Sequence, residues 1–267
     1  MMNTKDKTFR AGAGITLVML CIILLGAFWT PYDPNAMNAA EKMAAPSLRH
    51  LLGTDNFGRD IFSRVVQGAG ASFLIALCSV AIGLLVGLLA GGLTGYYGGW
   101  VDEILMRLND SITAFPSLLL ALVLIAVFHT GKYNIILALG IIFIPTFARI
   151  VRMEVAKQKS LDYVQNARLM GVRDMRVLFV HIMPNILPVL LSTIAIGFNN
   201  AVLAEASMSY LGLGVQPPDP SLGRMLNEAQ NYLSRAPWYA FSVGLAIILL
   251  VLGFGLLSDG LGGEGNA

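Results

Sequence analysis

SFLIALCSVAIGLLVGLLAGGLTGYY, residues 72–97, contains no aspartate, glutamate, lysine or arginine. An α-helix rises 1.5 Å per residue, so about 20 apolar residues are enough to cross the hydrocarbon core of a bilayer. The stretch lies within a longer uncharged interval, 65–101, whose glycine-rich and polar ends favour one crossing over two. We therefore predict a membrane-spanning helix over 72–97.

Five other intervals also lack charged side chains: 11–32, 111–131, 133–148, 177–204 and 236–258. Runs such as 141–144 do not alternate polar and apolar residues as membrane strands do. We therefore predict an all-α integral membrane protein with six transmembrane helices, near 12–30, 72–97, 112–130, 134–152, 185–206 and 238–258. The first is expected to be a retained anchor, because its long apolar run ends without a small-residue cleavage site.

Composition agrees with this fold class. Hydrophobic residues make up 56% of the 267 positions, charged residues make up 13%, and the mean hydropathy is +0.69. Soluble domains have about 25% charged residues, so this chain has too few to cover a water-exposed surface. No basic patch stands apart from the membrane-flanking loops, which argues against a nucleic-acid partner.

The lysines and arginines in the connections predict the orientation. With the N-terminus inside, the inner side holds Lys5, Lys7, Arg10, Arg107, Arg149, Arg152, Lys157, Lys159, Arg168, Arg173 and Arg176. The outer side holds Lys42, Arg49, Arg59, Arg64, Lys132, Arg224 and Arg235. The positive-inside rule therefore places both termini in the cytoplasm.

This topology divides the chain into segments. The cytoplasmic N-terminus is 1–11, the first transmembrane helix 12–30, the external segment 31–71, the five-helix transmembrane core 72–258 and the cytoplasmic tail 259–267. Within the core, 153–183 is the large inner loop and 207–237 the large outer loop.

Glycine recurs every four residues in the second predicted helix, at Gly83, Gly87, Gly91, Gly95 and Gly99. Residues four apart lie on one helical face, and glycine there lets a neighbouring backbone approach closely. Tight helix packing is the first interpretation, and a pivot or pathway wall is the alternative. Pro116 and Pro145 are expected to kink the third and fourth helices.

The inner loop 153–183 predicts two short helices joined at a glycine. Ser160 is a candidate N-cap for a helix reaching Met170, and Gly171 is a stop in the left-handed conformation. A second helix would begin near Asp174, before the prolines that open the fifth span. The residues leave two interpretations open: a compact protein-docking knob, or an amphipathic hairpin resting on membrane lipid.

Three motifs carry a resemblance to a known family. Asn166-Ala167-Arg168, Gly171 and Ile182-Met183-Pro184 resemble the EAA loop of the permease subunits of binding-protein-dependent ABC importers. The stretches 52–64 (LGTDNFGRDIFSR) and 205–218 (EASMSYLGLGVQPP) resemble the second, C-type permease subunit of the dipeptide, oligopeptide and nickel importers. The sequence departs from that family's pattern at Gln165 and Asn166, where Glu-Ala is usual.

The resemblance implies the type I ABC importer permease fold in a bacterial inner membrane. It implies a heterodimer with a sister permease, two ATPase subunits that hold ATP and Mg²⁺, and an external solute-binding protein. The ATPase-coupling loop would then comprise Gln165, Asn166, Ala167, Arg168, Gly171, Ile182 and Pro184. Peptides, nickel or metal chelates are all open as cargo.

Chemistry within the chain itself is not expected. No G-x-x-x-x-G-K-[ST] motif is present, so we expect neither ATP binding nor enzymatic activity in this chain. His50, His129 and His181 fall on different sides of the membrane, and we expect no metal site. A secondary transporter or channel without ATPase partners is the alternative function, although the span centres lack the ionisable residues expected for ion coupling.

Two sets of polar residues are left with open roles. The external motif Gly53, Asp55, Gly58, Arg59 and Asp60 is expected to pair internally or cap a helix, with contact to the binding protein as the alternative. Glu205, near the outer end of the fifth span, is expected to make a structural bond or to act as a gate or cargo contact.

Overall fold

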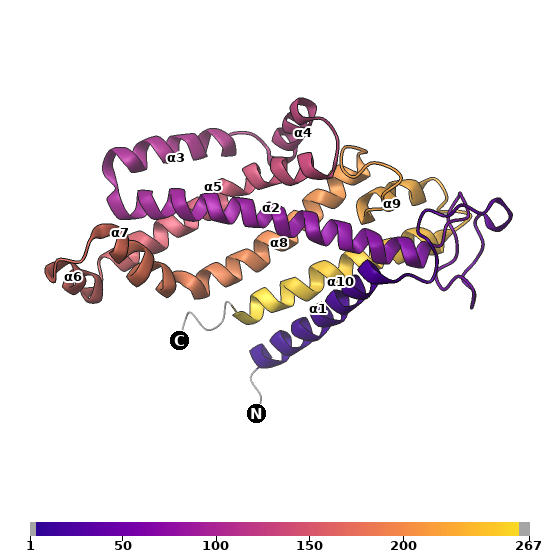
Figure 1. The fold of residues 1–267 in the computed structure, drawn as a ribbon, viewed down its shortest axis with the longest axis horizontal. Helices are drawn as coiled ribbons and strands as arrows, with labels where there is room; N and C mark the ends of the chain where they lie inside the picture. The colour runs from indigo at the N-terminus through magenta and orange to yellow at the C-terminus, as the bar shows by residue number, and fades with distance from the viewer. Residues whose placement is uncertain (1–3, 262–267) are drawn as a thin grey trace.

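The computed structural model describes residues 4–261, and most of them are helical (Figure 1). The helices are α1 (Thr4–Phe28), α2 (Ile61–Tyr97), α3 (Gly99–Thr113), α4 (Ser117–Phe128), α5 (Lys132–Lys159), α6 (Asp162–Leu169), α7 (Asp174–Arg176), α8 (Leu187–Tyr210), α9 (Leu222–Gln230) and α10 (Pro237–Leu261). A 3₁₀ turn, η1 (Ala39–Glu41), precedes α2, and the π-helical η2 (Val177–Ile182) and 3₁₀ η3 (Met183–Ile186) join α7 to α8. The tail expected at 259–267 lies largely outside the described residues.

The helices form a bundle with two distinct ends (Figure 1). α2 and α5 pack along one another, and α1 packs along α10. We call the end that carries segments 29–60 and 211–236 the loop end, and the end that carries residues 160–186 the knob end. The start of α1 and the end of α10 both point toward the knob end. This arrangement fits the expected placement of both termini on the side of the inner loop, while the side of the membrane stays a prediction.

Five helices or helical runs within the described residues are long and apolar enough to cross a membrane: Lys7–Phe28, Ile61–Tyr97, Lys132–Lys159, Asp174–Tyr210 and Pro237–Gly260. The third predicted span, 112–130, is not one helix. The chain breaks at Ala114–Pro116, and α3 and α4 meet at a bend of 91°. Proline lacks the N–H that would continue the helix and disfavours helical geometry in the residue before it, so Pro116 divides the span.

Two predicted loops contain more helix than expected. The external segment was expected to reach residue 71, but α2 already begins at Ile61. Asp60 is its N-cap, and its side chain accepts a hydrogen bond from the backbone N–H of Ser63 at 2.8 Å. The outer loop 207–237 contains α9, whose Leu222, Met225 and Ala229 are fully buried against the bundle. These helical parts contain charged residues, so they lay outside the uncharged intervals from which the spans were predicted.

The glycine-bearing face of α2 lies against α5. A Cβ atom built on Gly87 would lie 2.5 Å from Cβ of Phe147, and one on Gly95 would lie 2.6 Å from the carbonyl oxygen of Arg152. Gly83 and Gly91 face the same helix in the same way, whereas Gly99 lies beyond the end of α2 in open space. The two backbones therefore approach closely only because four successive turns carry no side chain.

Candidate functional site: a knob and a cavity

The knob, residues 160–186, is a compact unit at the end of α5. Its core holds Val164, Ala167, Val177, Leu178 and Ile182, packed against buried residues of α2, α5 and α8. Pro184 lies on the exposed side, in η3. The two expected helices are therefore present as α6 and α7–η2.

Gly171 ends α6 as expected from the sequence. Its φ is +79°, its N–H donates to the Arg168 carbonyl at 2.9 Å, and the Val172 N–H donates to the Ala167 carbonyl at 3.1 Å. These two bonds form a Schellman motif, which satisfies carbonyls left open at a helix C-terminus. No atom lies within 4 Å of a Cβ built on Gly171, so only its backbone conformation demands glycine.

Ser160 does not cap α6. Leu161 occupies the N-cap position, and the Ser160 hydroxyl instead donates to the Lys157 carbonyl at 2.8 Å, at the end of α5. The helix begins at Asp162, one residue later than a Ser160 N-cap would place it.

Ala167, which the resemblance places in the coupling loop, faces inward and does not present its side chain at the surface. It is 3% exposed and belongs to the core of the knob. Gln165 and Asn166, on the opposite face of α6, are exposed, and the Gln165 side chain donates to the Lys159 carbonyl at 3.1 Å. The family's usual Glu-Ala positions therefore lie at the surface of the knob.

Tyr96, which sequence reasoning missed, ties the knob to the bundle. Its hydroxyl donates to Asp174 at 2.5 Å and accepts from Nε of Arg168 at 3.2 Å, and the Arg168 guanidinium lies 4.8 Å from the centre of its ring. Asp174 begins α7 and Arg168 lies in the last turn of α6, so one side chain from α2 holds both knob helices. The only sequence signal was a pair of tyrosines at the end of a span.

The tip of the knob is exposed and apolar. Leu169 is 85% exposed and Met170 is 78% exposed, and Met175 on α7 is half exposed. Arg173 and Arg176, which are close to these residues in the sequence, are exposed as well. An apolar tip with exposed arginines suits either a protein groove or a membrane interface.

At the loop end, the residues of the external motif are buried and pair with one another. Arg59 donates to Asp55 at 2.6 Å and to Glu228 of α9 at 3.0 Å. Arg64 donates to the Pro34 carbonyl at 3.0 Å and lies 3.7 Å from Asp55. Gly53 and Gly58 supply the positive φ values, +78° and +77°, that fold the segment over these charges. The geometry thus favours internal pairing for this motif.

Glu205 is fully buried in α8 and accepts a hydrogen bond from the Ser209 hydroxyl at 2.6 Å. Ser72 of α2 and Ser221 at the start of α9 lie beside the same carboxyl. This arrangement joins three elements and lies outside the residues that line the cavity described next.

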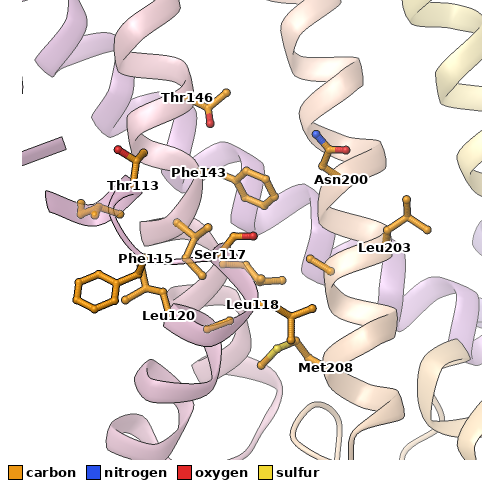
Figure 2. Close-up of a pocket in the computed structure, with 15 residues that line it drawn as sticks. Thr113, Phe115, Ser117, Leu118, Leu120, Phe143, Thr146, Asn200, Leu203 and Met208 are labelled. Carbon is orange, nitrogen blue, oxygen red and sulfur yellow. The ribbon is translucent and has the colours of Figure 1, made fainter. Parts of the chain in front are cut away.

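A cavity of about 500 Å³ opens between the α3–α4 bend, α5 and α8 (Figure 2). Its lining is largely apolar, with Phe115, Phe143, Leu203 and Met208 among the larger side chains. Thr146 of α5 and Asn200 of α8 are exposed and face the opening from its two sides. None of the described residues that line the cavity is charged.

The helices are long and apolar enough to cross a membrane and pack as one bundle, which is the architecture of a polytopic membrane protein. The chain belongs to the family of binding-protein-dependent transport system inner membrane components, whose model matches residues 83–262. It is therefore an inner-membrane permease subunit of an ABC importer.

Individual relatives agree with this assignment. The glutathione transport system permease protein GsiD of Pectobacterium atrosepticum is 41% identical over 254 residues, covering 93% of this chain and 83% of the relative. The dipeptide transport system permease protein DppC of Alkalihalophilus pseudofirmus is 35% identical, covering 96% and 84%. In fold, the chain is similar to the inward-facing MetNI methionine ABC transporter, with a TM-score of 0.62 and 18% identity, over 73% of this chain and 93% of that chain.

Proposed function

We propose that this chain pairs with a sister permease, encloses with it a pathway for short peptides, and is driven through the knob by separate ATPase subunits that hold ATP and Mg²⁺. An external solute-binding protein delivers the cargo at the loop end. Relatives named for dipeptide and glutathione transport favour short peptides over nickel or metal chelates. Alternating access then follows from movement of the bundle as ATP closes the ATPase pair.

The exposed tip of the knob is the observation that carries the coupling role. Leu169 and Met170 lie on a unit whose own core is complete, so their exposure is not needed to fold the knob. The bonds of Tyr96 to Arg168 and Asp174 connect that tip to α2, whose glycine face packs on α5. A displacement of the tip is therefore transmitted to the two central helices of the bundle.

Gly171→Val and Leu169→Asp test this role in the assembled complex. A left-handed conformation costs an ordinary residue roughly 1–2 kcal/mol, enough to tilt the tip without unfolding the bundle. We expect normal membrane insertion and sister-permease pairing for both variants, with reduced ATPase co-purification or ATP hydrolysis uncoupled from uptake. Ala167→Asp is not a clean test, because it would place a charge in the knob's own core.

Gly212 supplies a matched control at the opposite end. It ends α8 in the same Schellman geometry, with φ +82° and no atom within 4 Å of an added Cβ. Gly212→Val should leave ATPase co-purification unchanged. The opposing result has two parts: Gly171→Val and Leu169→Asp behave like Gly212→Val, and the double variant Arg173→Gln with Arg176→Gln loses the contact of the knob with lipid vesicles. In that case the knob is a membrane-surface hairpin and the coupling role is wrong.

A further inference from the structure

Four polar side chains line the cavity, Thr113, Ser117, Thr146 and Asn200, and two of them, Thr146 and Asn200, lie in long apolar helices without hydrogen-bond partners. Thr146 is at the midpoint of α5, and Asn200 is near the midpoint of α8. Within residues 4–261, neither side chain makes a hydrogen bond, although both are exposed. An amide or hydroxyl without a hydrogen bond in hydrocarbon costs roughly 2–7 kcal/mol, so this face is not built to meet lipid.

The neighbouring asparagine shows what a structural amide looks like in the same helix turn. The Asn199 side-chain amide is placed in the orientation in which both its atoms have a partner. Its nitrogen then donates to the Val251 carbonyl at 3.1 Å, and its oxygen accepts from the Gly255 N–H at 3.0 Å. Asn199 thus joins α8 to α10, and its hydrogen-bonding capacity is used. Asn200 points to the other side, into an opening where its own capacity stays available (Figure 2).

The chemistry of the lining limits what the cavity can bind. Its volume of about 500 Å³ fits a small molecule, and its described lining offers no charge to pair with a charged terminus or side chain. A primary amide offers donors and an acceptor, and a hydroxyl offers both as well, which matches the N–H and C=O of a peptide bond. The apolar remainder, such as Phe143 and Leu203, can contact side chains without selecting among them by charge.

We propose that Asn200 and Thr146 form a neutral hydrogen-bonding site for the backbone amide of a peptide in transit. The inference rests on the proposed function and assigns this chain a share in recognising the peptide bond, while charge selection lies elsewhere in the complex. A neutral site binds weakly, which suits a pathway from which the cargo must leave as readily as it enters.

The test uses the complete transporter reconstituted in proteoliposomes with its binding protein and ATPases, and the dipeptide Ala-Ala as probe. Asn200→Leu and Thr146→Val keep the side-chain shape and remove the hydrogen bonds. Each should lower the uptake rate about fivefold, the effect of losing one hydrogen bond of ordinary strength. ATPase and sister-permease co-purification should be unchanged. Ser207→Ala, on α8 but outside the cavity, is the control, since its hydroxyl only donates to the Leu203 carbonyl.

Asn200→Asp gives a readout that a structural role would not move. A carboxylate in the cavity should raise the uptake of Ala-Lys relative to Ala-Glu by about threefold or more. Unchanged Ala-Ala uptake in both neutral variants together with an unchanged Ala-Lys to Ala-Glu ratio would overturn this site and leave the permease function standing. Loss of sister-permease pairing in Asn200→Leu would overturn it too, by placing Asn200 at the subunit interface. Absence of peptide uptake by the unaltered transporter would instead overturn the proposed function itself.

Discussion

At the loop end Asp55 is fully buried and Arg64 is 1% exposed, whereas at the knob end Leu169 is 85% exposed. The loop end buries its charges against opposite charges of this chain, including Glu228 of α9. Both ends expose apolar side chains, Leu48 of the loop end fully, but at the knob end Leu169 and Met170 form the tip of a folded unit that also exposes Arg173 and Arg176. The difference teaches that the loop end neutralises its buried charges within this chain, whereas the tip of the knob end leaves its apolar side chains for a contact outside it.

The largest expected effect concerns the side of the membrane that each end faces. Single cysteines at Ser47 and Asp219 of the loop end and at Lys157 of the knob end, all at exposed positions, should label in an all-or-none manner. The background would carry Cys21→Ser and Cys78→Ser. Ser47 and Asp219 should react with an impermeant maleimide on intact cells, and Lys157 only after permeabilisation. External labelling at Lys157 would reverse the assignment of the two ends.

Removing one partner of the buried charges should have the next largest effect. Arg59→Ala removes the guanidinium that bonds both Asp55 and Glu228. Arg64 remains, 3.7 Å from Asp55 and 3.9 Å from Glu228. Breaking a buried pair costs about 3–5 kcal/mol, and Arg64 offsets part of this cost. We expect little folded protein in membranes and a lowered Tm in detergent. Arg49→Ala, an exposed arginine of the same segment, should behave like the unaltered protein. Equal stability of the two variants would show that the loop end does not depend on its charge pairs.

A smaller effect is expected where α2 and α5 join the two ends. Gly91→Leu would press a side chain against the Ala148 carbonyl and Val151, and overpacking of this kind costs about 1–3 kcal/mol. We expect a reduced yield of assembled complex, measured by size-exclusion chromatography. Gly244→Leu on α10, where an added Cβ meets no atom within 4 Å, is the matched control. If Gly91→Leu assembles as well as this control, the glycine face is not a packing surface.

Periodicity and local rules were enough for much of the fold. Uncharged intervals located the spans because crossing hydrocarbon requires a long run without charge, and Gly171 stopped α6 because a left-handed residue favours glycine. The break before Pro116 was indicated only as a kink, since a proline in a span does not tell how far the two halves turn. The predicted N-cap at Ser160 was wrong because serine also occurs at helix C-termini, and here it follows the last residue of α5.

Long-range partners were beyond the sequence. Arg59 and Glu228 lie 169 positions apart along the chain, and no local pattern in either segment predicts the other as its partner. The same holds for Tyr96 and Asp174, and for the inward direction of Ala167. These contacts depend on how α6, α7 and α9 are laid against the bundle, which local patterns do not encode.

The sequence by itself determined that the chain lies in a membrane, where most of its helices run and where the first helix of the knob stops, because hydration of charge and backbone sterics act over a few residues. Only the tertiary structure decided which charges are buried and paired, which apolar side chains stay exposed on the knob, and that Asn199 is bonded to α10 while Asn200 faces a cavity. Two adjacent asparagines are identical in composition and hydropathy, and they differ only because neighbouring residues on a helix point in directions about 100° apart.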